Sequence, residues 1–241
     1  MTTAWGSEVL ESGFAILPHI FSAEEVDALA RELSTVLNRT DEVEGPIRDK
    51  VGTVYAGRNL LRIFEPVKTI WRRPPLLELL REVLGPDVGL VRVLFFNKPP
   101  ERTWALPWHK DLTIAVKPHS GESTVFSKPT LKAGVPHVEA SREVLEAMLT
   151  LRIHLDDMTE VNGPLLVVPG SHRLGKVPVA SYETAQTILG SRGDVLAMRP
   201  MLAHRSISSC EGTMLHRRIL HLEFTGLPHL PEGFEWHDFI A

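Results

Sequence analysis

The sequence contains a single cysteine, Cys210, so no disulfide can form within the chain. Cysteine usage of this kind is typical of proteins from a reducing cytoplasm. No apolar run reaches the roughly 18 residues that a membrane-spanning helix needs, so we expect none. Residues 1–18 lack the basic segment followed by a long apolar stretch that marks a secretory signal. These absences predict a cytoplasmic protein that does not enter a membrane.

An excess of basic residues is missing as well. The 26 Lys and Arg residues are outnumbered by 30 Asp and Glu residues, which gives a formal net charge of −4. Nucleic-acid-binding proteins need a basic face, so we expect no nucleic-acid partner. Composition says nothing about the oligomeric state.

The chain is predicted to form one domain over residues 1–241, with a helical layer at about residues 1–87. Hydrophobic residues make up 43% and charged residues 23%, as in ordinary soluble domains. A short apolar run at residues 13–17 predicts a strand. Ser22 and Glu25 then form a capping-box pattern ahead of apolar residues at helical spacing. A second helix is expected to begin at Pro75 and to end at Gly85.

From Val88 onward, short β-rich runs alternate with Pro, Gly and Asp, which favours a sandwich or barrel. Strands are expected at residues 88–97, 112–116, 149–155, 164–170, 194–198 and 217–224. Residues 120–138, within a lid-like insertion at about 115–140, predict a long loop that is either a lid or disordered. Short helices are expected at residues 141–148 and 181–189.

The segment Trp108-His109-Lys110-Asp111 is the central motif. On a strand, residues two apart face the same side, so His109 and Asp111 would point together. Two histidines and one carboxylate form the facial triad of non-haem iron(II) oxygenases, which leaves coordination positions open. The motif alone is weak, because a surface strand with two polar residues has the same pattern.

The rest of the site is expected from two later segments. Residues 194–206 are predicted as a strand, a tight turn and a second strand ending in His204, the candidate third ligand. The next predicted strand opens with Arg217 and Arg218. An arginine one strand after a metal ligand suits an anionic co-substrate, because its planar fork accepts a carboxylate bidentately.

Residues 155–172 carry L-D-D, N-G-P-L and P-G-S-H in order, and here the sequence resembles the phytanoyl-CoA dioxygenase family. The resemblance extends from about residue 13 to residue 224. It implies a mainly β fold with flanking helices, the double-stranded β-helix or jelly-roll. It also implies an enzyme that uses Fe(II), 2-oxoglutarate and O2.

Residue by residue, the resemblance implies that His109, Asp111 and His204 bind the metal. Arg217 would hold the distal carboxylate of 2-oxoglutarate, although the lengthened turn before it leaves Arg218 as an alternative. Ser206 matches a hydroxyl that lies beside that arginine in the family.

Four further polar residues are candidates with open alternatives. Asn97 and Lys98 match a family segment that precedes the His-x-Asp strand, and either they contact the co-substrate or they end a solvated strand. Arg152 and His154 alternate with apolar residues. Either they point into the barrel, where an anionic substrate or Glu223 would pair with their charge, or they face solvent.

The resemblance implies hydroxylation of a small organic substrate with release of succinate and CO2. One alternative keeps the cofactors but ends in desaturation, cyclisation or epimerisation within a biosynthetic pathway. A further alternative is a non-catalytic barrel that binds a ligand, because a fold does not fix a function.

Overall fold

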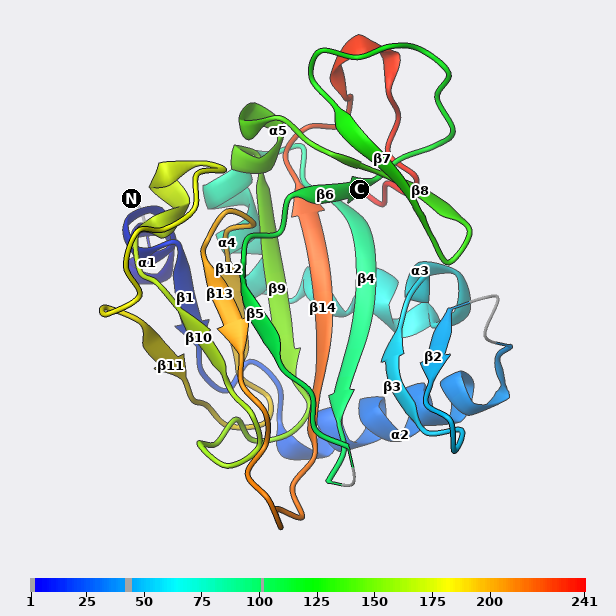
Figure 1. Ribbon diagram of the computed structural model, residues 1–241, viewed down its shortest axis with the longest axis vertical. Coiled ribbons are helices and arrows are strands. Elements are labelled where there is room, and N and C mark those ends of the chain that lie inside the picture. Colours follow the sequence, from blue (N-terminus) through cyan, green and yellow to red (C-terminus); the bar gives the residue numbers. More distant parts are fainter. Residues whose placement is uncertain (1–2, 42–44, 101) are drawn as a thin grey trace.

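Three antiparallel sheets form the framework of the molecule, which is a computed structural model that describes residues 3–41, 45–100 and 102–241 (Figure 1). The major sheet has seven strands in the order β1-β12-β9-β14-β4-β3-β2. These are β1 (Phe14–Leu17), β12 (Val195–Met198), β9 (Met148–His154), β14 (Arg217–Thr225), β4 (Gly89–Lys98), β3 (Val54–Gly57) and β2 (Pro46–Arg48).

Two smaller sheets complete the set. The four-stranded sheet is ordered β11-β10-β13-β5 and the three-stranded sheet β6-β8-β7. Their strands are β11 (Gln186–Ile188), β10 (Leu165–Val167), β13 (His204–Ser206), β5 (Leu106–His109), β6 (Thr113–Ala115), β8 (Val135–Glu139) and β7 (Ser127–Lys132).

The helices lie mostly in the N-terminal part of the chain. They are α1 (Ala4–Ser12), α2 (Ala23–Arg39), α3 (Leu60–Ile63), α4 (Pro74–Leu84) and α5 (Arg142–Glu146), with 3-10 turns at Glu65–Lys68, Ile70–Arg72, Ser171–Leu174 and Pro231–Gly233. The capping box is present: Glu25 N–H donates to Ser22 Oγ, and the Glu25 carboxylate accepts from Ser22 N–H. Gly85 ends α4, as the sequence predicts. None of the described helices is long and apolar enough to span a bilayer.

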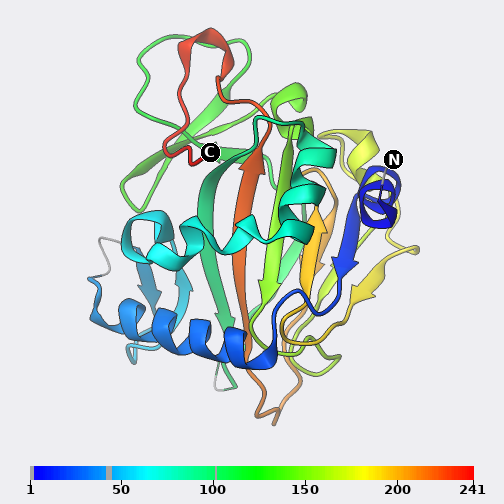
Figure 2. The ribbon, with the colours of Figure 1, turned by 180° about the vertical axis from the view of Figure 1, so that it is seen from behind.

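Successive side chains along the strands of the major sheet point to opposite faces, and one face is apolar while the other is polar. Leu151, Leu222 and Phe224 belong to a buried cluster with residues of α2 and α4, and Figure 2 shows these helices lying across that side of the sheet. Arg152 and His221, which pair across β9 and β14, lie on the opposite face. The helices therefore stabilise the sheet from behind, and the other face is left for the site.

The four-stranded sheet packs against one end of this polar face. A second cluster joins Phe14, Leu196 and Met198 of the major sheet to Leu165 and Val167 of β10. The two sheets therefore form a sandwich that is apolar at this end and opens into a cavity farther along. This is the jelly-roll arrangement that the sequence predicts, with helices on one side.

Several local predictions differ from the structure. Residues 194–206 do not form a hairpin, because β12 joins the major sheet and β13 the four-stranded sheet, and β13 begins at His204. Residues 181–189 are not helical, since edge strand β11 pairs with β10 there. Residues 120–138 include the β7–β8 hairpin instead of forming one long loop. The segment 1–87 also supplies strands to both edges of the major sheet.

Candidate metal centre

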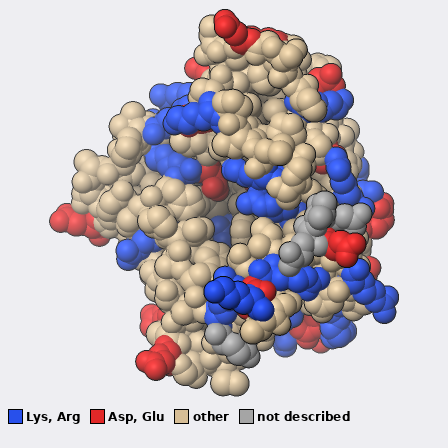
Figure 3. Space-filling model, turned by 45° about the vertical axis from the view of Figure 1, so that its right-hand side comes forward, with Lys and Arg blue, Asp and Glu red and all other residues tan. Residues whose placement is uncertain are grey.

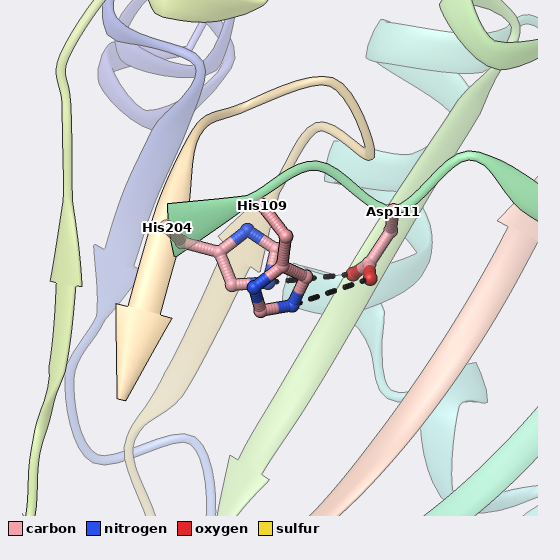
Figure 4. A group of neighbouring side chains, drawn as sticks. All are labelled: His109, Asp111 and His204. Atoms are coloured by element: carbon pink, nitrogen blue, oxygen red, sulfur yellow. Dashed lines mark ion pairs between the residues drawn. The ribbon is translucent and has the colours of Figure 1, made fainter. Parts of the chain in front are cut away.

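The pairing of β5 with β13 places two histidines side by side. His109 and His204 are direct partners in the register, and Asp111 follows just after the end of β5. Asp111 Oδ1 lies 3.9 Å from His109 Nε2, and Asp111 Oδ2 lies 3.6 Å from His204 Nε2 (Figure 4). One ligand atom from each residue lies within 4.8 Å of the other two, which is close enough for one metal ion.

Backbone hydrogen bonds hold both imidazoles in the orientation that a metal needs. His109 Nδ1 lies 2.7 Å from Pro107 O, and His204 Nδ1 lies 2.8 Å from Leu202 O. A carbonyl oxygen only accepts, so each Nδ1 carries the proton and each Nε2 presents its lone pair to the centre. Hydrogen bonding of the distal ring nitrogen is the usual way in which proteins orient histidine ligands.

The segment that carries Asp111 is also anchored. Asp111 N–H donates to Pro200 O at 2.8 Å. Lys110 Nζ donates to Ser171 O and to Gly175 O at 2.9 and 2.7 Å, within and just after the P-G-S-H stretch. Ser171 Oγ in turn accepts from Ala203 N–H, one residue before His204. The P-G-S-H stretch therefore positions both halves of the triad.

The electrostatics of the triad favour the ligand forms of its side chains. Burial acts to raise the pKa of Asp111, but His204, His221, His109 and Arg92 outweigh it and lower this pKa to about 2. Burial lowers the pKa of His204 to about 4, although the Asp111 charge opposes that shift. At neutral pH the site therefore offers a carboxylate and an unprotonated imidazole, the forms that bind metals.

A cavity extends from the triad along the polar face of the major sheet and has a volume of about 530 Å³, its opening included. Its walls combine charged side chains with apolar ones: Arg92, Leu94, Phe96, Trp104, Leu106, His109, Asp111, Arg152, Leu165, His204, Ser206, Arg217, His221 and Glu223. Buried sites of mixed character suit small polar ligands.

Arg217 is a buried cation that contacts no carboxylate in the part of the chain that the structure describes. Its side chain is among the largest that are fully buried, it lines the cavity, and its Nε has no hydrogen-bond partner. Burial, followed by repulsion from Arg152, lowers its pKa to about 9. Arg218 points away and donates to both oxygens of Asp156, at 2.9 and 2.6 Å. Of the two arginines, Arg217 is the one whose charge is available to a ligand in the cavity.

The three other predicted co-substrate residues are placed differently from one another. Ser206 lines the cavity and accepts a hydrogen bond from Lys98 Nζ at 3.2 Å. Lys98 itself is completely buried behind Ser206 and also donates to Gly163 O and Ile207 O. Asn97 faces the other side of β4, where its Nδ2 donates to Val54 O. The structure therefore brings Ser206 to the cavity, with Lys98 behind it, and leaves Asn97 outside.

Arg152 and His154 both lie on the inner face of β9 and are buried. Arg152 lines the cavity and contacts no carboxylate in the described parts of the chain; its one side-chain partner is Met198 Sδ, at 4.0 Å. His154 does not line the cavity, and no described residue forms a hydrogen bond with its Nδ1. Burial, with Arg152 and Arg217 adding to it, lowers the pKa of His154 to about 3.

The sequence reasoning overlooked Arg92, which lines the cavity from β4. Its guanidinium donates twice to Glu223, at 2.9 and 2.6 Å, and once to Thr113 O at 3.1 Å. The sequence does place Arg92 on the cavity side, because Arg92, Leu94 and Phe96 are every second residue of β4 and share one face of the strand. Both faces of that strand are apolar on average, so alternation alone did not single out the arginine.

Fold and site together define a class. A jelly-roll that brings two histidines and one carboxylate to the mouth of its cavity has the ligand set of mononuclear non-haem iron proteins. Residues 9–208 match the phytanoyl-CoA dioxygenase (PhyH) family. The chain belongs to this family, which confirms the resemblance seen in the sequence.

Individual relatives are distant. An ectoine dioxygenase of Bordetella parapertussis is 26% identical over 183 residues, which covers 71% of this chain and 51% of the relative. A probable alpha-ketoglutarate-dependent hypophosphite dioxygenase of Stutzerimonas stutzeri is 26% identical, covering 70% of this chain and 53% of the relative. The chain thus spans about half the length of these curated relatives.

Solved structures support the fold. The crystal structure of EctD from S. alaskensis with bound Fe superimposes with a TM-score of 0.71 at 20% identity, covering 93% of this chain and 76% of that chain. The predicted fold class is therefore confirmed.

Proposed function

We propose that this protein is an iron(II)- and 2-oxoglutarate-dependent dioxygenase that hydroxylates a small organic substrate. The observation that carries the proposal is the presence, in one cavity, of a two-histidine, one-carboxylate triad and a buried arginine that has no acidic partner among the described residues. The first group suits a divalent metal and the second suits a carboxylate. A co-substrate that chelates iron at one end and carries a carboxylate at the other satisfies both.

The donor set fits iron(II). Hydrogen bonds at Nδ1 orient the rings of His109 and His204, so that each Nε2 lone pair points to the centre. The low pKa of Asp111 keeps its carboxylate ionised. Two imidazoles and one carboxylate are the ligands of non-haem iron(II) oxygenases. When bound, iron with 2-oxoglutarate and O2 supplies the oxidation: one oxygen atom enters the substrate and the other enters succinate, with loss of CO2.

The chain's own residues would bind and orient the co-substrate. Arg217 offers a planar fork to the distal carboxylate. Ser206 accepts from Lys98, which leaves the Ser206 hydroxyl proton free to donate to the same carboxylate. Trp104, within 5.9 Å of the Arg217 guanidinium, covers this end of the cavity. With Arg217 2% exposed, water has little access to the anion once it is bound.

The substrate is proposed to be a small molecule. The relatives named above act on small polar compounds, ectoine and hypophosphite. The alternative outcomes of desaturation, cyclisation or epimerisation begin with oxidation of the same substrate carbon, and product analysis separates them.

Two measurements test the proposal. Anaerobic addition of Fe(II) and then 2-oxoglutarate should produce the visible absorption band of an iron–2-oxo-acid chelate. Admission of O2 should then convert 2-oxoglutarate to succinate slowly, even without substrate. Arg218→Ala should behave like the wild type. Absence of both the band and succinate formation would leave the protein as a ligand-binding jelly-roll.

A further inference from the structure

A second, smaller cavity lies beside the metal-centre cavity, and the two share Arg92 and Leu94. Its walls come from the segment after β3, from β4, from the β7–β8 hairpin and from the C-terminal segment: Arg58, Asn59, Leu61, Val91, Arg92, Val93, Leu94, Ala115, Lys132, Val135, His137, His237 and Asp238. Figure 3 shows Lys and Arg side chains gathered around a hollow on this side of the molecule.

Two of the cations in this second cavity have no carboxylate partner in the described parts of the chain. Arg58 is half-buried, and neither an ion pair nor a side-chain hydrogen bond engages its guanidinium. Lys132 Nζ has a single partner, the Thr113 hydroxyl at 3.2 Å. Arg92 differs from both, because Glu223 already neutralises it. Arg58 and Lys132 therefore offer two positive charges that no described carboxylate contacts directly.

A third polar group is directed at the same place. His137 is 3% exposed, its Nδ1 donates to Val135 O at 2.9 Å, and its buried Nε2 has no hydrogen-bond partner within residues 3–41, 45–100 and 102–241. Burial lowers the pKa of His137 to about 4, and repulsion from Arg92, Lys132 and Arg58 adds to that shift. Because Nδ1 carries the proton and the ring is neutral at neutral pH, Nε2 is an acceptor, and a hydroxyl or N–H of a ligand would satisfy it.

The acidic groups nearby are few and mostly engaged. Asp238 is the carboxylate among the lining residues and lies 3.9 Å from His237 Nε2. Glu223 is bound to Arg92, and Asp111 belongs to the triad. The charges of iron(II) and of the 2-oxoglutarate dianion would cancel each other in the first cavity. The second cavity keeps its positive charge when the cofactors are bound.

The loop and the hairpin that carry these cations are joined directly. Asn59 Nδ2 donates to Ala133 O, at the turn of the β7–β8 hairpin, at 3.2 Å. Lys132 precedes that turn, and Arg58 precedes Asn59. The hydrogen bond thus joins the loop and the hairpin whose cations, Arg58 and Lys132, both line the second cavity.

We propose that the substrate carries a carboxylate or phosphate group that binds between Arg58 and Lys132, and that a hydroxyl or N–H of the same substrate donates to His137 Nε2. This inference rests on the proposed function, because it assigns the substrate class of the same enzyme. The rest of the substrate would pass Arg92 and Leu94, which line both cavities, to reach the triad. The β7–β8 hairpin, which the sequence predicted as a lid-like insertion, would then be a substrate-recognition element.

Binding of inorganic phosphate tests the subsite without turnover. Calorimetric titration is made on protein loaded with Zn(II) and 2-oxoglutarate, so that the first cavity is filled, and again on metal-free protein. We expect saturable binding in both. Arg58→Gln and Lys132→Gln should each weaken it about tenfold, the effect of one charge-assisted contact, and Lys132→Arg should restore it.

The matched control is Lys128→Gln. Lys128 lies on the same strand as Lys132, but it is exposed and pairs with Glu139 outside the second cavity. Its replacement should leave phosphate affinity unchanged. Absence of saturable binding, or equal weakening by Lys128→Gln and Lys132→Gln, overturns the proposal. A repeat with acetate ranks the two anions, and tighter binding of either one supports the subsite.

The two proposals fail in distinguishable ways. If 2-oxoglutarate does not bind but phosphate does, in a manner that depends on Arg58 and Lys132, the proposed function is wrong and the anion subsite stands. If 2-oxoglutarate binds to the metal-loaded protein and phosphate does not, the substrate class is wrong and the proposed function stands.

Discussion

His109 and His204 face each other directly across the β5–β13 pair, with their ring centroids 4.2 Å apart. The chain between them is 94 residues long, so the pairing of two short strands creates the site. Asp111 completes it from just beyond the end of β5. Metal binding should therefore depend on this carboxylate and also stabilise the strand pair.

Replacing the carboxylate ligand tests this relationship. Asp111→Ala should weaken Fe(II) or Zn(II) binding by at least about 100-fold, because loss of even an outer-shell partner typically costs 10- to 100-fold. Calorimetry on metal-free protein measures the affinity. Asp87→Ala, at an exposed position outside both cavities, is the control. Wild-type affinity in Asp111→Ala would rule out the triad.

Addition of metal should also raise the melting temperature of the wild type. A ligand that binds only the folded state stabilises it by mass action. The same addition should leave the melting temperature of Asp111→Ala nearly unchanged. An equal rise in both proteins would place the metal elsewhere.

Replacing each of the two consecutive arginines of β14 should affect 2-oxoglutarate affinity to a very different extent. Arg217→Ala should raise the dissociation constant of 2-oxoglutarate by roughly 30- to 1000-fold, which corresponds to about 2–4 kcal/mol for a buried charged contact. Arg218→Ala removes a partly exposed pair with Asp156 and should change this constant less than about threefold. Quenching of tryptophan fluorescence by 2-oxoglutarate measures both, and a larger effect at Arg218 would reverse the assignment.

The sequence predicted the parts of the structure that depend on local signals. The capping box of Ser22 and Glu25 begins α2, and Gly85 ends α4. The spacing of His109 and Asp111 predicted a shared direction on one strand. The two side chains do lie together beside His204, although β5 ends at His109 and Asp111 lies beyond it. These features need only neighbouring residues or a motif of fixed spacing.

Other features depend on long-range pairing, which no local pattern encodes. Residues 194–206 read as one hairpin, yet β12 and β13 belong to different sheets. The alternation along β14 could not separate Arg217 from Arg218, because the strand is buried on both faces. Arg58 and Lys132 lie 74 residues apart, and the contact of the hairpin with Asn59 brings them together.

His154 should make the protein sensitive to acid. Its folded-state pKa of about 3 lies below the ordinary histidine value of 6.5. Between these two values the unfolded chain binds a proton that the folded chain does not, so the free energy of unfolding falls as pH decreases from 6.5 toward 3. At pH 5 this loss amounts to about 2 kcal/mol for one such residue.

His154→Asn should abolish that part of the acid sensitivity. Urea unfolding at pH 7.5 and at pH 5 gives the change in unfolding free energy for each protein. The variant should lose about 2 kcal/mol less than the wild type between the two values, whatever its stability at pH 7.5. Exposed His229 provides the control, and His229→Asn should lose as much as the wild type. Equal losses in all three proteins would contradict the buried neutral state of His154.

Gly163, in the N-G-P-L stretch, should tolerate no side chain. Its φ is +73°, and a Cβ there would lie 2.6 Å from Ile207 O, next to the Lys98 ammonium that supports Ser206. Gly212 has a similar φ of +78° but nothing within 4 Å of an added Cβ. Gly212→Ala therefore measures the backbone strain alone, which is about 1 kcal/mol.

Gly163→Ala should lower the free energy of unfolding by the same strain plus the cost of displacing Ile207, for a total of about 2–4 kcal/mol. Because Ile207 directly follows Ser206 and accepts from Lys98, the variant should also weaken 2-oxoglutarate binding, whereas Gly212→Ala should not. Urea unfolding and 2-oxoglutarate titration measure the two effects. If both alanine variants lose equal stability, the contact with Ile207 O is relieved by a small backbone shift, and the N-G-P-L turn does not position Ser206.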